Sequence, residues 1–201
     1  MIAIIDYGVG NLRSVEKAFA HVGVPAQVTS DPGAISQAPG VVLPGVGAFA
    51  DCMKNLREYR LIDTVQGLIR SGKPLLGICV GLQILFEASE ENGYHQGLGV
   101  FGGVVKRIPG ALKVPQIGWN NLKIKKNTAL FAGIPDESYT YFVHSYSAVP
   151  AEPSIVAATT HYGTELTVAV QKDNVYAVQF HPEKSSAVGL QMLKNFGGLV
   201  K

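Results

Sequence analysis

Residues 73–86 have the sequence Lys-Pro-Leu-Leu-Gly-Ile-Cys-Val-Gly-Leu-Gln-Ile-Leu-Phe, in which two kinds of pattern meet at one cysteine. The apolar run after the Gly-Lys-Pro turn predicts a short strand that is buried on both faces. After it, Leu82, Leu85 and Phe86 recur at three- and four-residue spacing, which predicts a helix. The segment therefore predicts a strand–turn–helix unit with Cys79 at the turn.

The turn has the form Gly-x-Cys-x-Gly, from Gly77 to Gly81. This is the pattern of a nucleophile elbow, with Cys79 in the place of a hydrolase serine. Glycines two residues before and after the nucleophile suit a tight turn whose flanking backbones pass close together. At a helix amino terminus, partial positive charge favours the thiolate of Cys79. The alternative is a buried cysteine that only fills space, and these five residues alone favour neither interpretation.

The composition is that of an ordinary globular chain. Its 201 residues are 47% hydrophobic and 16% charged with a formal net charge of +2, which excludes a disordered chain. We expect a single domain over residues 1–201, able to bury about 70% of the surface of the unfolded chain. Lys and Arg are dispersed, and the densest basic run, 123–126, alternates like the solvated face of a strand. Neither a nucleic-acid surface nor a membrane surface is expected.

Cysteine usage and the amino terminus predict a cytoplasmic location. Cys52 and Cys79 form no disulfide framework and suit a reducing compartment. Residues 1–5 lack a basic leader, and no apolar run approaches the roughly 18 residues of a membrane-spanning helix. The histidines show no metal-ligand spacing with the cysteines. We therefore expect a soluble protein with no metal and no other cofactor.

The first half of the chain alternates strand and helix patterns. The strand that leads into Cys79 is preceded by expected strands at 2–7, 26–29 and 40–43. The apolar spacing predicts helices from Leu12 to Val22, from about residue 49 through Leu56, and from Leu61 to Ile69. This alternation predicts a doubly wound, mostly parallel α/β sheet flanked by helices. Gly8 and Gly10 lack the third glycine of a dinucleotide-binding motif, which favours a simple tight turn.

The second half, from about residue 97, is rich in Val, Tyr and Thr. It predicts antiparallel strands and hairpins that extend or flank the first sheet, at 100–108, 114–126, 139–149, 154–160 and 165–180. A last helix is expected from Ser185 to Leu199. Because sites in such sheets form at the carboxyl ends of strands, the segment after residue 43 and Cys79 could face one cleft.

A thiolate nucleophile needs a base, and the base needs an orienting partner. Residues 175–180 alternate as a strand and end in His181-Pro182-Glu183. Pro182 favours an extended conformation at His181, and residues i and i+2 of an extended chain project to the same side. The imidazole of His181 and the carboxylate of Glu183 can therefore meet. Taken alone, such a pair is more typical of an ordinary surface contact.

Together, Gly-x-Cys-x-Gly-x-Gln at 77–83 and Phe-His-Pro-Glu at 180–183 resemble the class I (triad) glutamine amidotransferases. Further motifs, in order along the chain, are similar to the family of glutaminase subunits of imidazole glycerol phosphate synthases, which act in histidine biosynthesis. They are Asp6-Tyr7-Gly8-x-Gly10-Asn11, Pro44-Gly45-Val46-Gly47-x-Phe49, Gly118-Trp119-Asn120, Tyr141-Phe142-Val143-His144-Ser145-Tyr146 and His181-Pro182-Glu183-Lys184-Ser185-Ser186. The resemblance spans the chain from residue 2 to the last helix.

The resemblance implies hydrolysis of L-glutamine to glutamate and ammonia through a thioester on Cys79. His181 would act first as base and then as acid, and Glu183 would orient its ring. The oxyanion would be bound by the N–H of Val80 and by a second N–H, from Val46 or Gly47. The implied substrate-binding residues are Gly45, Gln83, Glu91, His144, Ser145 and Tyr146, of which Ser145 would act through its backbone because strand alternation turns its side chain away.

The resemblance also implies a partner, a (β/α)₈ cyclase subunit in a heterodimer. The cyclase would use the ammonia to make imidazole glycerol phosphate and an aminoimidazole carboxamide ribotide. The implied interface residues are Asn11, Trp119, Asn120, Tyr141 and Lys184, with core packing as the alternative for Trp119. The second oxyanion donor would point away until the partner's substrate binds, so the isolated chain would be a poor glutaminase. Gln116 departs from the His or Asn typical of the family, and no role is assigned to it.

Three alternatives remain beside this interpretation. The chain could serve a different synthase, although its Gly-Trp-Asn and Lys-Ser-Ser motifs argue against the anthranilate, aminodeoxychorismate and pyridoxal phosphate types. It could be a non-catalytic regulatory subunit of the same fold, although Cys79, His181 and Glu183 are all present. It could also be a cysteine hydrolase of peptides, which would need no synthase partner.

Overall fold

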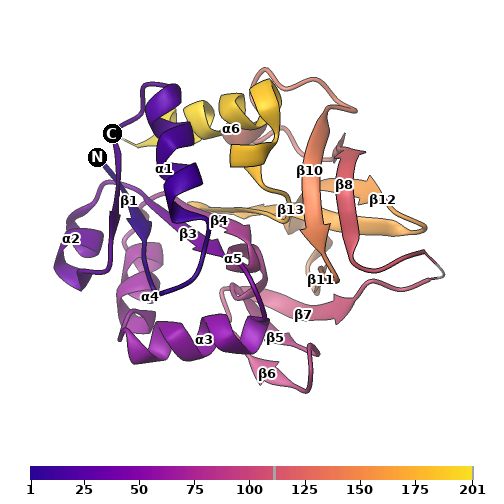
Figure 1. The fold of residues 1–201 in the computed structure, drawn as a ribbon, viewed down its shortest axis with the longest axis horizontal. Helices are drawn as coiled ribbons and strands as arrows, with labels where there is room; N and C mark the ends of the chain where they lie inside the picture. The colour runs from indigo at the N-terminus through magenta and orange to yellow at the C-terminus, as the bar shows by residue number, and fades with distance from the viewer. Residues whose placement is uncertain (111, 201) are drawn as a thin grey trace.

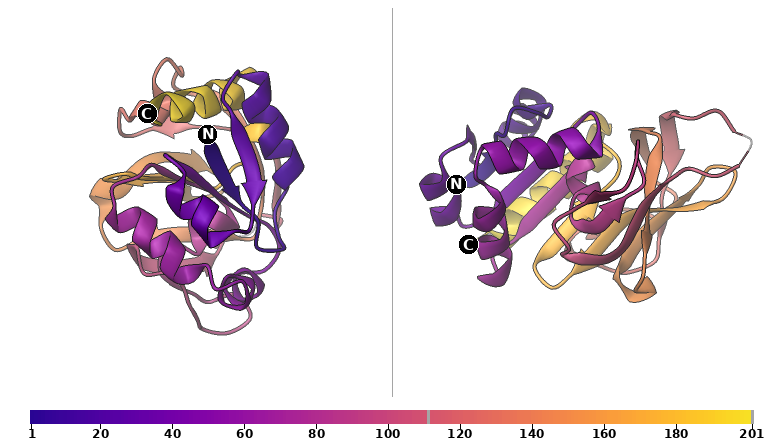
Figure 2. Two further views of the ribbon diagram at one scale, coloured as in Figure 1. Left: turned by 90° about the vertical axis from the view of Figure 1, so that its left-hand side faces the viewer. Right: turned by 90° about the horizontal axis from the view of Figure 1, so that it is seen from below.

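The computed structural model describes residues 1–110 and 112–200, and its centre is one long mixed sheet. Within the described residues this sheet has 12 strands, and helices pack on both of its faces (Figures 1 and 2). The expected doubly wound α/β fold is confirmed, with parallel pairing in its first half and several antiparallel strands in its second.

The first half supplies parallel strands in the order β2-β1-β3-β4. They are β1 (Ile2–Ile5), β2 (Ala26–Thr29), β3 (Val41–Gly45) and β4 (Leu75–Cys79). Every residue of β1, β3 and β4 is buried, which explains their nearly continuous apolar sequences. β1 ends earlier than expected because the side chain of Asp6 accepts a hydrogen bond from the N–H of Gly8 (3.0 Å) and turns the chain.

Helices connect these strands: α1 (Leu12–His21), α2 (Pro32–Gln37), α3 (Phe49–Glu58) and α4 (Ile62–Arg70). α1 buries Val15, Ala18 and Phe19, as its apolar spacing predicts. α2 has no counterpart among the expected helices. It has six residues, begins at the Asp31 N-cap and buries only Ile35, so it lacks an apolar period long enough to recognise.

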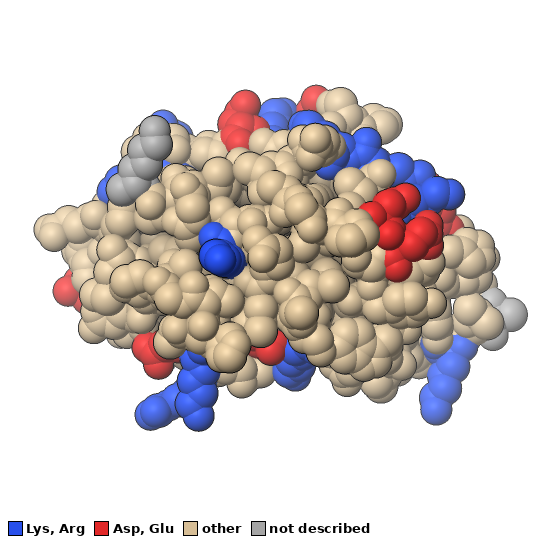
Figure 3. Space-filling view, turned by 90° about the horizontal axis from the view of Figure 1, so that it is seen from above, with Lys and Arg blue, Asp and Glu red and all other residues tan. Residues whose placement is uncertain are grey.

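The final helix, α6 (Ser186–Leu199), packs beside α1 through Phe196 and Phe19, whose ring centroids lie 6.4 Å apart. α1 and α6 cover one face of the sheet, and α3 and α4 cover the other (Figures 1 and 2). Figure 3 shows the face with α1 and α6, where most charged side chains lie toward the margins. Lys194 is the one charged residue in the sequence of α6. Among the described residues, no helix combines the length and apolar character needed to cross a membrane.

The second half extends the same sheet beyond β4. β14 (Val175–Val178) pairs with β4 in parallel, and β13 (Glu165–Lys172), β11 (Tyr146–Pro150) and β7 (Phe101–Arg107) follow in antiparallel pairs. β5 (Phe86–Ser89) pairs with β7 in parallel and with β6 (His95–Gln96), and β12 (Val156–His161) pairs with β13 and with β9 (Lys123–Ile124). Three 3-10 turns lie in connections: η1 (Ala129–Phe131), η2 (Pro153–Ile155) and η3 (Pro182–Lys184).

A separate two-stranded sheet stands against this half of the molecule (Figure 1). It pairs β8 (Gln116–Asn121) with β10 (Tyr139–His144) in antiparallel register. Only Ser145 separates β10 from β11, so the chain passes from the small sheet to the large one within a single residue. The expected strand at 139–149 is therefore two strands in two different sheets.

The helix expected after Cys79 is much shorter than its apolar spacing suggests. α5 (Val80–Gln83) has four residues, and Phe86 already belongs to β5. The carbonyl of Ile84 accepts a hydrogen bond from Leu98 N–H (2.8 Å), and that of Leu85 accepts from Val100 N–H (2.9 Å). The segment after β6 thus takes the carbonyls that a longer helix would have used.

Candidate active site

Cys79 stands at the junction of β4 and α5 in a backbone conformation that few residues adopt. Its φ is +56° and its ψ is −113°, a strained combination that costs on the order of 1–3 kcal/mol. A Cβ on Gly81 would lie 1.9 Å from the carbonyl oxygen of Leu43, and one on Gly77 would lie 2.9 Å from the carbonyl oxygen of Gly81. Both glycines are therefore required by close backbone approach, as the elbow pattern predicts.

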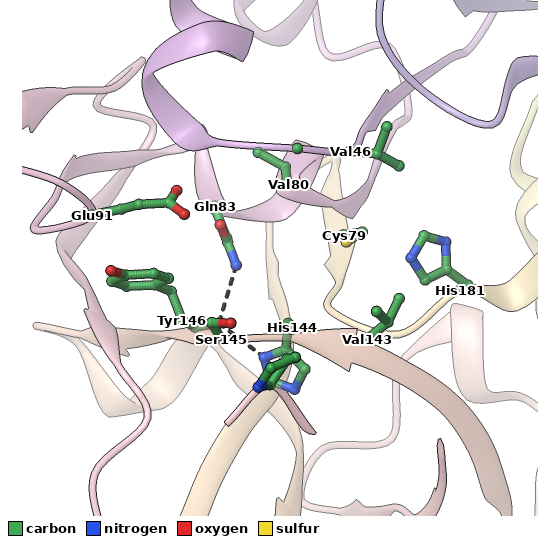
Figure 4. Close-up of a pocket in the computed structure, with 12 residues that line it drawn as sticks. Val46, Cys79, Val80, Gln83, Glu91, Val143, His144, Ser145, Tyr146 and His181 are labelled. Carbon is green, nitrogen blue, oxygen red and sulfur yellow. Dashed lines mark hydrogen bonds between the residues drawn. The ribbon is translucent and has the colours of Figure 1, made fainter. Parts of the chain in front are cut away.

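A cavity of about 310 Å³ opens at the carboxyl ends of β3 and β4 (Figure 4). Its lining combines the elbow, the segment after β3 and the crossing from β10 to β11, and consists of Val46, Gly47, Cys79, Val80, Gln83, Glu91, Pro115, Val143, His144, Ser145, Tyr146 and His181. The segment after β3 and Cys79 do face one cleft. Gly45 lies behind the lining, where an added Cβ would meet the N–H nitrogen of Gly81 at 2.7 Å.

His181 and Glu183 form a buried pair beside Cys79. Nδ1 of His181 lies 2.9 Å from Oε1 of Glu183, and their side chains are 3% and 0% exposed. The contact forms and His181 is extended, as Pro182 predicts, but the chain does not stay extended as far as Glu183. β14 ends at Val178, and Glu183 lies in the 3-10 turn η3, which brings its carboxylate back to the ring.

The surroundings of His181 favour its protonated form. Burial lowers the pKa of the ring, but hydrogen bonds with Cys79 and Glu183, and the negative charges of both groups, outweigh burial and raise the pKa to about 9. His181 is therefore an imidazolium at neutral pH, with Nδ1 on the carboxylate of Glu183.

Gln179 is a site residue that the sequence analysis missed. It is fully buried, its Nε2 donates to Sγ of Cys79 (3.8 Å), and its Oε1 accepts a hydrogen bond from Nε2 of Gln83 (3.0 Å). The available signal was a polar residue between the buried residues Val178 and Phe180, since such a residue needs a partner.

The carbonyl oxygen of Tyr146 is the anchor of the pocket floor. It accepts hydrogen bonds from Nε2 of Gln83 (3.1 Å) and from Nδ1 of His144 (2.8 Å) (Figure 4). Both hydrogens of the Gln83 amide nitrogen are thereby used, on Tyr146 and Gln179, and only its oxygen remains for another partner. The NH₂ group of the buried Gln83 is thus satisfied within the protein.

His144 is held in the neutral form. Burial lowers its pKa to about 4, against the weaker opposing effect of its hydrogen bond to Tyr146. A neutral ring has one N–H, and the carbonyl of Tyr146 takes it at Nδ1. Nε2 is then an acceptor, and it lies 2.9 Å from Oε1 of Gln116. Two acceptors cannot pair here, so we assign the Gln116 amide the flipped orientation, in which its NH₂ group donates to Nε2. The carbonyl of Tyr146 therefore fixes the tautomer of His144, and Gln116, to which the sequence assigned no role, is its second hydrogen-bond partner.

The expected alternation over residues 144–146 is wrong, because Ser145 lies between strands of different sheets. The rings of His144 and Tyr146 point in different directions (Figure 4). The carbonyl of Ser145 is occupied by the N–H of Ile108 (2.9 Å). The backbone of Ser145 therefore holds β10 and β11 to the end of β7.

Glu91 reaches the pocket from the segment after β5. Its Oε2 accepts a hydrogen bond from the N–H of Phe49 (2.7 Å), the first residue of α3. A carboxylate at a helix amino terminus also complements the helix dipole. Glu91 thus ties the pocket wall to the helix that follows the segment with Val46 and Gly47.

Three of the expected interface side chains gather on one exposed surface. Trp119 is 51% exposed, which contradicts the core-packing alternative, and its ring meets that of Tyr141 edge-on at 6.1 Å. Nζ of Lys184 lies 5.9 Å from the centre of the Tyr141 ring, within cation–π range. Asn120 instead donates to the carbonyl of His161 (2.9 Å), and Asn11 directly precedes α1.

The described residues hold no group of three or more His, Cys, Asp or Glu side chains arranged to bind a metal ion. Cys52 and Cys79 are both free thiols.

Comparison with known proteins gives a consistent result. The family model described as glutamine amidotransferase class-I matches residues 3–198. The imidazole glycerol phosphate synthase subunit HisH of Moorella thermoacetica is 55% identical over 200 residues, which cover 100% of this chain and 95% of that protein. The HisH subunit of Syntrophotalea carbinolica is 52% identical over 206 residues, with 99% and 100% covered. A solved glutamine amidotransferase superposes with a TM-score of 0.77 at 21% identity, covering 98% of this chain and 100% of the other. At this identity the match shows a shared fold.

Proposed function

The chain belongs to the class I glutamine amidotransferase family, and from this premise we propose that it is the glutaminase subunit of an imidazole glycerol phosphate synthase. In this role it hydrolyses L-glutamine to glutamate and passes the ammonia to a cyclase subunit. The observation that carries the proposal is the pocket in which Cys79 and the His181–Glu183 pair meet. The names of the relatives that are more than half identical support the choice of synthase.

In the resting pair the thiol proton of Cys79 has passed to His181, and acylation starts with attack of the Cys79 thiolate on the side-chain amide carbon of glutamine. Protonated His181 gives its proton to the amide nitrogen, the C–N bond breaks, and ammonia leaves a γ-glutamyl thioester on Cys79. Water then attacks the thioester and gives a proton to His181, the C–S bond breaks, and glutamic acid leaves and loses its proton to solvent. The pKa of about 9 at His181 supports the first step, because the ring holds the required proton at neutral pH.

Each attack places negative charge on the substrate oxygen, which needs backbone donors. The N–H of Val80, directly after the nucleophile, is one donor, and an N–H of Val46 or Gly47 is the other. Loss of one such donor typically raises the barrier by roughly 2.7–4 kcal/mol. The position of all three residues in the pocket lining supports this assignment.

The α-amino and α-carboxylate groups of glutamine bind at the far end of the pocket from His181. Glu91 and the free oxygen of Gln83 are acceptors there and suit the ammonium. The segment around Ser145 and Tyr146 lines the same end. The hydrogen bond from Phe49 to Glu91 leaves one oxygen of that carboxylate for the substrate.

The cyclase subunit, a (β/α)₈ protein, docks on the exposed aromatic surface formed by Trp119, Tyr141 and Lys184, in a heterodimer. Ile117 (63% exposed) belongs to the same face of β8, because residues two apart on a strand share a side. Its partner across the small sheet is Val143, which lines the pocket. This face thus runs from the pocket wall to the molecular surface, which suits transfer of ammonia to a docked partner. Asn11 and Asn120 lie outside the aromatic cluster and are weaker candidates for the interface.

The experiment is measurement of glutamate release from glutamine by the purified chain, alone and with the cyclase and its nucleotide substrate. We expect slow release alone, a large increase with the liganded cyclase, and loss of at least about 10³-fold in Cys79→Ala. Trp119→Ala should weaken cyclase binding, while Tyr94→Ala, an exposed aromatic residue elsewhere (65%), should not. Full activity that ignores the cyclase would overturn the subunit assignment, and no activity in any state would favour a regulatory subunit.

A further inference from the structure

Residues 44–48 form the end of β3 and its connection to α3, and they supply the second oxyanion donor in the proposed function. It borders the elbow closely, because a Cβ on Gly45 would meet both Gly81 and the hydroxyl of Tyr7. Among the residues the structure describes, neither the N–H of Val46 nor that of Gly47 has a hydrogen-bond acceptor. These donors are therefore available, and what fixes their direction is the orientation of the neighbouring peptide units.

Tyr7 fixes the first of these units. Its ring is fully buried beyond the end of β1, and its hydroxyl donates to the carbonyl oxygen of Pro44 at 2.5 Å. Nδ2 of Asn55 on α3 donates to the backbone carbonyl of Tyr7 (3.1 Å), which holds the residue between β1 and α3. Because a peptide unit is planar, fixing the carbonyl of Pro44 also fixes the N–H of Gly45.

Cys52 fixes the second unit. This buried residue of α3 donates from Sγ to the carbonyl oxygen of Val46 at 3.5 Å. Burial raises the pKa of Cys52 to about 11, so the group stays a thiol and keeps its proton for donation. The planar unit then directs the N–H of Gly47 away from Cys52. The unit between the two held carbonyls, Gly45–Val46, keeps a free N–H.

We propose that Tyr7 and Cys52 are positioning residues for the second oxyanion donor, an inference that rests on the proposed function. Their hydroxyl and thiol hold the carbonyls of Pro44 and Val46. Rotation is thereby confined to the intervening Gly45–Val46 unit, whose N–H supplies the donor. Neither side chain touches the substrate. They hold the peptide units on both sides of the Val46 N–H, so that this donor is directed at the oxyanion before charge develops there.

The kinetic test uses the complex with the cyclase and its nucleotide substrate. Tyr7→Phe and Cys52→Ala should each lower kcat for glutamine about 10-fold, with KM nearly unchanged, since only the transition state gains the donor. Cys52→Ser should recover most of the rate lost in Cys52→Ala, because its hydroxyl also donates. The rate at which iodoacetamide alkylates Cys79 should not change, because that reaction forms no oxyanion.

The matched control is Ser71→Ala, which removes a side-chain hydroxyl hydrogen bond to a backbone carbonyl, that of Leu68 (2.8 Å), at the end of α4 and outside the pocket lining. It should leave kcat unchanged. A wild-type kcat in Tyr7→Phe and Cys52→Ala, or an effect on KM alone, would overturn the inference while the proposed function stands.

A second measurement keeps the inference testable without turnover. Deuterium exchange of a peptide that covers residues 44–49 should be faster in Tyr7→Phe and Cys52→Ala than in the wild-type free chain. Equal exchange would show that neither group restrains this segment. If the wild-type complex released no glutamate, the proposed function would fail, and this exchange result would still decide whether the two residues restrain the segment.

Discussion

The turn that carries His181 and the strand crossing that carries His144 line the same pocket, yet they hold their rings in opposite charge states. His181 lies between the sulfur of Cys79 and the carboxylate of Glu183, and its pKa is raised to about 9. His144 lies between a backbone carbonyl and the amide of Gln116, and its pKa is lowered to about 4. Burial alone lowers the pKa of both rings.

The difference teaches that the neighbours of a buried histidine, more than its depth, determine whether it carries a proton. The carboxylate of Glu183 and the sulfur of Cys79 make His181 a proton carrier for the proposed chemistry. Neutral dipoles make His144 a fixed hydrogen-bonding support for the carbonyl of Tyr146. Exchanging the neighbours should therefore exchange the behaviour.

The largest effect is expected when the surroundings of His181 are made to resemble those of His144. Glu183→Gln keeps the shape of the side chain but removes its charge, so the pKa of His181 should fall clearly below 9. The kcat for glutamine should fall on the order of 10²–10³-fold, because the ring loses both its proton and its orienting partner. Glutamate release and NMR titration of the ring are the measurements. Glu165→Gln, an exposed partner of Lys125, is the control, and an unmoved His181 titration would contradict the explanation.

A smaller effect concerns folding stability as a function of pH. The unfolded chain binds a proton at His144 near pH 6.5, whereas the folded chain does so only near pH 4, so stability should fall as the pH drops from 6.5 towards 4. At pH 5 the free energy of unfolding should be about 2 kcal/mol lower than at pH 7. This pH lies 1.5 units below 6.5, and each unit contributes at most about 1.4 kcal/mol.

Urea unfolding of the wild type and of His144→Gln at pH 7 and pH 5 measures this effect. The variant lacks the titrating ring but keeps all the other titratable groups. The free energy of unfolding should decline less in His144→Gln. Parallel decline in both proteins would mean that His144 titrates alike in the folded and unfolded chains. His181 acts in the opposite sense, and its contribution to stability is lost as pH rises from 6.5 through 9.

The smallest effect is expected from giving His144 a charged neighbour. Gln116→Glu places a carboxylate at Nε2, about 2.9 Å from the ring, and should raise the pKa of His144 by roughly one unit, or about 1.4 kcal/mol. NMR titration of the ring measures the shift, with Gln171→Glu on β13 as a control for the added charge. A pKa that stays near 4 would mean that the new carboxylate takes the proton instead of the ring.

Local sequence patterns predicted the fold where close packing leaves few choices. The elbow was recognisable because Gly77 and Gly81 lie too close to neighbouring backbone for any side chain. The helix predicted beyond Gln83 was wrong, because the carbonyls of Ile84 and Leu85 accept hydrogen bonds from residues 98–101. No local apolar period reveals partners at that distance in the sequence. α2 went unrecognised because six residues with one buried side chain give no period.

The residues of the site also differ in whether local sequence could predict them. Cys79, His181 and Glu183, which the structure brings together, could be predicted because each belongs to a short motif with a chemical reason for its spacing. Gln179 and Gln116 were missed because their roles depend on partners that are distant in sequence. Tyr7 and Cys52 were likewise invisible as a pair, since only folding brings them to the two ends of one loop.

One acceptor of the pocket, the carbonyl oxygen of Tyr146, belongs to the main chain and serves both Gln83 and His144. Every amino acid carries the same carbonyl, so a change of codon at position 146 alters the side chain and leaves this anchor in place. Substitution scans will therefore register Gln83 and His144 as sensitive positions while the atom that holds them together goes unrecorded. For this pocket, side-chain substitution cannot test the backbone carbonyl on which two of its residues depend.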